Sequence, residues 1–151
     1  MQWVTTKRVK LDRTACAWLI LRQIDPQAEF VFVAKDEMPG AIAAGAHPFH
    51  NYVFTGTPRA LSGLQELMAE HGLDKSDPAL VLFAESVRNG ERAGWAKNGC
   101  ENEGLWALAN GNSALAKDDA DMVSRMLPIY DALYAYCLQR AAGGSGWTAD
   151  A

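Results

Sequence analysis

Residues 1–33 read MQWVTTKRVK LDRTACAWLI LRQIDPQAEF VFV and carry the strongest folding signals in the chain. The aromatic and β-branched residues 3–5 predict a short strand. The apolar segment 12–24 predicts a helix, which Asp25-Pro26 ends because the residue before a proline disfavours helical geometry. Residues 29–33, EFVFV, predict a second strand. A strand, a helix and a strand therefore open the domain.

The remainder of the chain predicts mainly helices. Leucines at helical spacing indicate a helix over residues 60–71, with Gly72 just after its end. Asp77-Pro78 begins another helix that we expect to end near Arg88, and the polar, glycine-rich residues 89–99 predict a loop. Two further helices are expected over residues 101–109, closed by Asn110-Gly111, and over residues 118–140. The predicted fold class is α+β: a single compact, mostly helical domain with a small sheet over residues 1–141, then a flexible tail over residues 142–151.

Composition limits the classes of function. The chain has 151 residues, of which 49% are hydrophobic and 21% charged, so one domain with a proper core is expected. A net charge of −4 argues against nucleic acid as a partner. No apolar run approaches the roughly 20 residues that cross a bilayer, so no membrane partner is expected. The three cysteines form no CxxC pair and no signal peptide is seen, which predicts reduced thiols and a cytoplasmic location.

Cationic residues gather near the N-terminus, where five of the 14 Lys and Arg residues fall within the first 22 positions. Asp12 and Arg13 stand at the predicted helix start, where Asp12 is expected to cap the helix and free N–H groups attract anions. Trp18 and Arg22 are four residues apart, so an Arg–indole stack could orient the guanidinium toward an oxyanion. A surface stack with packing value alone is the other interpretation.

Two further side chains have alternative interpretations. Cys16 follows Arg13 by three residues near a helix N-terminus, an environment that can lower a thiol pKa, but a buried packing role is favoured. Asp131 falls in line with Leu127 on the predicted apolar face of the last helix. Because an unpaired buried charge is costly, we expect Arg13 or Arg22 to pair with Asp131, either structurally or as part of a ligand site.

His47 and His50 flank Pro48-Phe49 in a predicted loop. Two histidines at this spacing could share a metal ion, although loop histidines without a cysteine or carboxylate motif are more often exposed. The metal ligands, if there are any, are left unassigned, and a divalent metal stays open as a cofactor.

Several blocks of the sequence resemble the C-terminal domain of the bacterial chromate-resistance (ChrB-type) proteins. The blocks are Trp3-Val4-Thr5, Asp12-Arg13, Ala15-Cys16, Trp18-Leu19-Ile20 with Arg22, Ile24-Asp25-Pro26, Ala28-Glu29-Phe30 and the segment IYDALYAY at 129–136. The resemblance implies a cytoplasmic bacterial protein linked to the chromate response. Full-length relatives carry an additional N-terminal part for DNA, which is not seen here, so we expect no DNA binding.

The chain also departs from the family pattern. The family commonly has Phe-Asp where this sequence has Phe49-His50, and a His and a Cys further on where it has residues 54–56 (FTG) and Leu61-Ser62. If those family residues bind metal or oxyanion, the resemblance implies a changed ligand set in this chain.

Two functions are carried forward. The first is a binding module for a small anionic molecule, an oxyanion or a carboxylate, in an Arg-lined pocket whose predicted ligand-binding residues are Asp12, Arg13, Cys16, Trp18 and Arg22. The second is a small enzyme, metal-dependent or not, that acts on an acidic organic substrate with Asp131 or Glu29 as general base. A homo-oligomer is compatible with both functions.

Overall fold

The computed structural model describes residues 1–50, 61–96 and 100–143. The strands are β1 (Gln2–Thr6), β2 (Glu29–Val33) and β3 (His47–Pro48). The helices are α1 (Leu11–Leu19), α2 (Met38–Ala43), α3 (Gly63–Glu70), α4 (Leu73–Ser76), α5 (Pro78–Ala96), α6 (Cys100–Leu115) and α7 (Asp119–Ala141). A π-helical turn η1 (Ile20–Ile24) extends α1, and a 3₁₀ turn η2 (Lys35–Glu37) precedes α2. The predicted class, a compact and mostly helical α+β domain with a small sheet, is confirmed for this part of the chain.

The sheet is parallel, with the strand order β2-β1-β3. β1 pairs with β2 so that Trp3 lies beside Phe30 and Thr5 beside Phe32. Helix α1 and turn η1 connect these two strands, as a parallel pair requires a crossover. The strand-helix-strand stretch at the N-terminus thus forms one βαβ unit.

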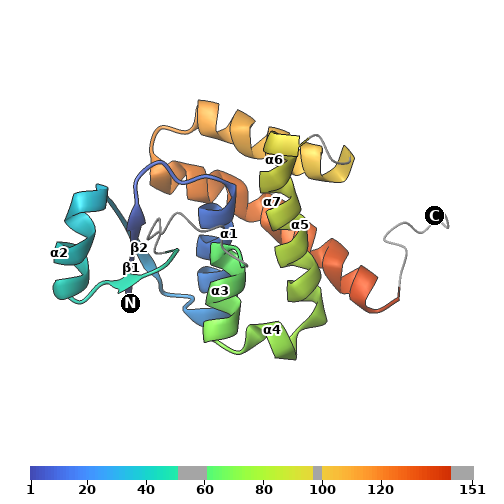
Figure 1. Ribbon diagram of the computed structural model, residues 1–151, viewed down its shortest axis with the longest axis horizontal. Helices are drawn as coiled ribbons and strands as arrows, with labels where there is room; N and C mark the ends of the chain where they lie inside the picture. Colours follow the sequence, from blue (N-terminus) through green and yellow to red (C-terminus); the bar gives the residue numbers. More distant parts are fainter. Residues whose placement is uncertain (51–60, 97–99, 144–151) are drawn as a thin grey trace.

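The two faces of the sheet are covered by different layers (Figure 1). Side chains on a strand point to alternate faces, so neighbouring residues enter different clusters. Val4 packs with Met38 of α2 and with Ala46, whereas Trp3 belongs to the main core on the opposite face. Helix α2 closes the smaller face, and the other helices build the larger one.

Helix α1 lies at the centre of that larger layer, with α3, α5 and α7 against it (Figure 1). The Trp18 ring stacks on Phe83 of α5 at a centroid distance of 4.3 Å. Tyr130 of α7 is fully buried, and its hydroxyl donates to the Leu11 carbonyl at 2.7 Å and lies 2.8 Å from Thr14 Oγ1. The buried hydroxyl is therefore satisfied, and it fixes α7 to the first turn of α1.

Several predicted boundaries agree with the structure. Strand β2 covers residues 29–33 as expected, and Gly72 follows α3 in a left-handed conformation (φ 69°) that glycine adopts readily. Helix α7 ends at Ala141, with Asp118 as its N-cap. Residues 144–151 lie outside the described residues, so the flexible tail stays a prediction. Within the described ranges, no helix combines the length and the apolar character needed to cross a membrane.

Two predicted helix ends are wrong. Helix α5 continues through Asn89-Gly90 to Ala96, so the expected loop is absent over residues 89–96, and residues 97–99 lie outside the described part. Gly90 is buried, and a Cβ there would lie 3.0 Å from Leu11 and 3.3 Å from Leu105. Helix α6 likewise passes Asn110-Gly111 and reaches Leu115. Glycine at position 90 thus allows close helix packing instead of ending a helix.

Candidate functional site

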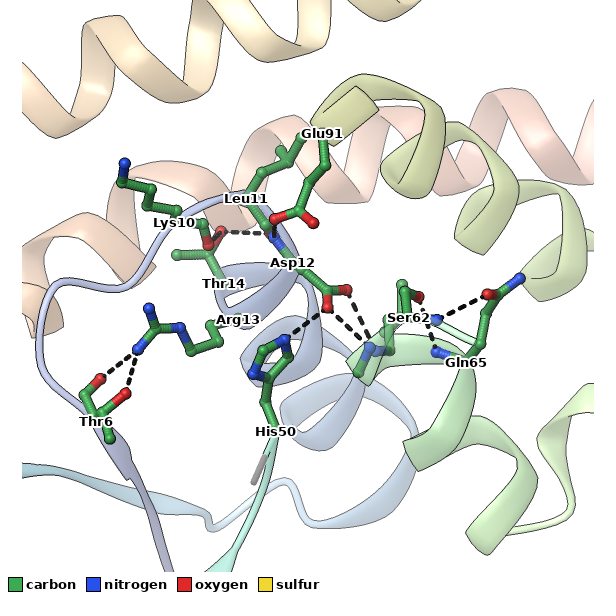
Figure 2. A network of polar contacts seen from close by, with 12 residues as sticks. Thr6, Lys10, Leu11, Asp12, Arg13, Thr14, His50, Ser62, Gln65 and Glu91 are labelled. Atoms are coloured by element: carbon green, nitrogen blue, oxygen red, sulfur yellow. Dashed lines mark hydrogen bonds and ion pairs between the residues drawn. The ribbon is translucent and has the colours of Figure 1, made fainter. Parts of the chain in front are cut away.

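The start of α1 holds a buried carboxylate with several partners (Figure 2). Asp12 accepts the backbone N–H groups of Gly63 at 2.9 Å and Leu64 at 3.2 Å. Nε2 of His50 lies 2.8 Å from the same carboxylate. The predicted capping role for Asp12 in its own helix is wrong, because Lys10 occupies the N-cap position and Asp12 caps α3 instead. The positive end of the α3 dipole and its free N–H groups explain this placement.

A second carboxyl group approaches Asp12 from α5. Oε1 of Glu91 accepts the backbone N–H of Asp12 at 3.1 Å (Figure 2). Burial raises the pKa of the Glu91 carboxyl, and the nearby Asp12 carboxylate raises it further, while the hydrogen bond from the Asp12 N–H opposes both effects. Glu91 therefore holds a proton more readily than an exposed glutamate does.

Arg13 shapes the loop between β1 and α1. Its guanidinium donates to the Thr6 carbonyl at 2.8 Å, to Thr6 Oγ1 at 2.5 Å and to the Arg8 carbonyl at 3.2 Å. On the other side of the loop, Asp119 of α7 accepts the N–H groups of Arg8 at 3.0 Å and Val9 at 2.7 Å. Arg8 takes a left-handed conformation (φ 63°). The loop is therefore held from two sides.

A cavity of about 330 Å³ opens beside this loop, between the start of α1 and helices α5, α6 and α7. Its polar lining comes from Lys10, Glu91, Asn110 and Ser113, and its apolar lining includes Leu11 and Trp106. The volume is close to the lower end of ligand pockets, which begin at about 300 Å³.

A second hollow of about 350 Å³ adjoins the first, since both are lined by Lys10, Ser113 and Met122. We call the two hollows together the α6 groove. Arg8 adds a second cation to it. The carboxylate of Asp119 also lines the groove, but both of its oxygens accept backbone N–H groups of the loop. Its charge is thereby partly neutralised at the groove wall.

Asp131, Trp18 and Arg22 meet at one place, away from the α6 groove. The Arg22 guanidinium binds Asp131 in a bidentate manner, with two contacts of 2.9 Å, and Trp18 Nε1 donates to the same carboxylate at 2.8 Å. The prediction that Asp131 is buried is wrong: its side chain is 46% exposed. The apolar pattern of α7 correctly predicted that Asp131 lies on the side of the helix that meets α1, where it pairs with Arg22. Both side chains are nevertheless about half exposed to water. The hydrogen bond from Arg22 lowers the pKa of the Asp131 carboxyl.

The other predicted residues are placed separately. Cys16 is fully buried, and burial together with the Asp12 carboxylate raises its thiol pKa well above the usual value. Glu29 is exposed at the start of β2. His47 packs edge-on against Trp3 at 4.6 Å between ring centroids, while His50 pairs with Asp12. In the described part of the chain, no group of three or more His, Cys, Asp and Glu residues is arranged to hold a metal ion.

Asp12 and Arg13 do not line the α6 groove, but each is hydrogen-bonded to a residue that does, Asp12 to Glu91 and Arg13 to Arg8. Arg22, Trp18 and Asp131 lie at another position. The catalytic roles of Asp131 and Glu29 stay predictions. Three residues of the groove lining were not predicted: Glu91, Trp106 and Ser113. Glu91 was missed because it follows Asn89-Gly90, in a segment expected to be a loop. One signal was present in the sequence: Lys10 is one of the five cationic residues in the first 22 positions, the cluster from which an anion site was predicted.

The fold and this groove define a small α+β domain with a ligand-sized hollow, lined by both polar and apolar side chains, beside its first helix. The chain belongs to the family described as "ChrB, C-terminal domain", whose family model matches residues 3–137. It is 32% identical over 136 residues to Protein ChrB of Cupriavidus metallidurans (strain CH34), an alignment that covers 89% of this chain. The alignment spans 40% of the length of that relative. No solved structure matches the chain significantly.

Proposed function

We propose that this domain is a chromate-response module that binds a small oxyanion in the α6 groove, with the Lys10 ammonium as its main charge partner. Chromate as the first ligand to test, and a cytoplasmic location, come from the family. The observation that carries the proposal is the position of Lys10. Its side chain is exposed and lines both hollows, and no carboxylate among the described residues forms an ion pair with it.

The state of the other cations supports this choice. The Arg13 guanidinium donates its hydrogen bonds to loop carbonyls, and the Arg22 guanidinium is paired with Asp131. An ammonium that keeps its donors available is the better anion partner, because a charge-assisted hydrogen bond is stronger than a neutral one. In this proposal, the predicted ligand residues Asp12 and Arg13 position the groove wall and do not contact the ligand.

The rigidity of the loop also supports the proposal. Arg13 and Asp119 hold the backbone of residues 6–9, directly before Lys10, so little ordering of this loop is needed when a ligand binds. Ordering a flexible loop when a ligand binds costs free energy and so lowers the affinity. A loop that is already held in its bound conformation avoids this cost.

The test is a titration of the purified protein with chromate by equilibrium dialysis, repeated with Lys10→Gln. Removing one charged contact should weaken binding by roughly 10- to 100-fold, the equivalent of about 1.5–3 kcal/mol. Lys7→Gln is the matched control, since Lys7 is exposed in the same loop but does not line the groove. The proposal fails if the wild type binds no chromate, or if Lys10→Gln and Lys7→Gln behave alike.

A further inference from the structure

Glu91 faces the cavity from the side of α5, across from the loop that carries Lys10. Its Oε1 atom is held by the N–H of Asp12, so the carboxyl group has a defined orientation at the cavity wall (Figure 2). An ammonium and a carboxyl group thus line the same cavity. A ligand that fits both groups needs a negatively charged oxygen for Lys10 and a hydrogen-bond donor for Glu91.

The surroundings of Glu91 disfavour a fully deprotonated ligand. Burial and the nearby Asp12 carboxylate both raise the pKa of the Glu91 carboxyl, while the hydrogen bond from the Asp12 N–H and the electrostatic effects of His50 and Arg13 lower it. A dianion without a proton would present only lone pairs to the Glu91 carboxylate, and like charges at close range raise the free energy of the complex. An oxyanion that keeps one O–H group would donate that hydrogen to Glu91 instead.

We infer that Glu91 determines specificity in the α6 groove: it admits oxyanions that carry an O–H group, such as hydrogen phosphate and the part of chromate that is protonated near neutral pH, and rejects sulfate. Sulfate has the same tetrahedral shape but no proton at that pH, so shape alone could not separate the two. This inference rests on the proposed function, because it assumes that the groove binds an oxyanion.

The experiment measures the binding of chromate, inorganic phosphate and sulfate to the full chain by equilibrium dialysis at one neutral pH. For the wild type, we expect sulfate to bind at least about tenfold more weakly than chromate or phosphate, the factor given by one unmatched charged contact. Glu91→Gln keeps an oxygen acceptor for the Asp12 N–H and offers an N–H donor to the ligand. It should therefore strengthen sulfate binding by about tenfold and remove most of the discrimination.

Two further variants separate specificity from a structural role. Glu91→Asp keeps the negative charge, so it should still reject sulfate even if all the affinities fall. Glu85→Gln removes an exposed carboxylate from the same helix and should leave the ratio of affinities unchanged. Thermal melts of each variant establish that it is folded before binding is compared.

The outcomes distinguish the inference from the proposed function. Equal binding of chromate and sulfate by the wild type, or an unchanged ratio in Glu91→Gln, would overturn the role of Glu91 and leave oxyanion binding intact. A wild type that binds none of the three anions would overturn both.

Discussion

Asp12 caps a helix to which it does not belong: its carboxylate, in the first turn of α1, accepts the backbone N–H of Gly63 at the start of α3 with a distance of 2.9 Å. The two residues are 51 positions apart in sequence. The contact joins the helix that follows β1 to the helix that leads into α4 and α5. It also places the Asp12 backbone N–H where Glu91 can accept it.

Asp12→Ala should lower the free energy of unfolding by about 2–4 kcal/mol, because it leaves buried N–H groups of α3 and the His50 ring without their charged acceptor. Urea unfolding followed by circular dichroism measures the loss. Asp74→Ala, an exposed acid in α4, is the control and should change stability by less than about 0.5 kcal/mol. A loss for Asp12→Ala no larger than that of the control would show that the capping contact is not stabilising.

Gly63→Ala should also destabilise the protein, by about 1–3 kcal/mol, because an added Cβ would overlap the His50 ring and force it from Asp12. Gly40→Ala is the opposite case. Nothing lies within 4 Å of a Cβ at that helical position, so the variant should gain roughly 0.5–1 kcal/mol from the better helix propensity of alanine. Thermal unfolding of the two variants should shift in opposite directions, and a shift of the same sign would contradict the packing around Gly63.

Asp131→Asn tests the exposed pair with Arg22. The pKa of Asp131 is lowered from 3.8, so its contribution to stability is present above that pH and is lost as the pH falls through the lowered value. We expect the variant to lose up to about 1 kcal/mol at neutral pH, a modest amount because water screens the pair. The difference from wild type should vanish in acid, as measured by urea unfolding across pH. A difference that is constant with pH would mean that the charge of Asp131 is not involved.

Cys16 should be inert in the folded protein. Its thiol is buried and its pKa is raised well above the usual value, so little thiolate forms near neutral pH. Alkylation followed by peptide mass spectrometry should show slow modification of Cys16 in buffer and rapid modification in urea. Cys16→Ala should retain the fold, and any ligand affinity with it. Rapid alkylation of Cys16 in the native protein would instead identify it as an accessible thiol.

The sequence by itself determined the parts of the fold that depend on local preference. Strand β2 is short, aromatic and β-branched, and it forms where predicted. Helix α7 begins after Asp118, whose side chain accepts the Asp121 N–H at 2.8 Å, and Gly72 follows α3 with a positive φ. In each case, a few neighbouring residues contain the physical cause.

Only the tertiary structure decided what the polar residues do. The local sequence around Asp12 is typical of an N-cap residue of α1. The free N–H groups that it accepts, however, belong to α3, which is distant in sequence. Gly90 resembles a helix end, yet it lies inside α5 because Leu11 and Leu105 pack against its bare Cα. Asp131 was predicted to pair with Arg13 or Arg22, and the structure pairs it with Arg22, whereas the 46% exposure of its side chain could not be read from the apolar pattern of α7. The α6 groove arises in the same way, because Lys10, Glu91 and Ser113 come from three segments that no local pattern connects.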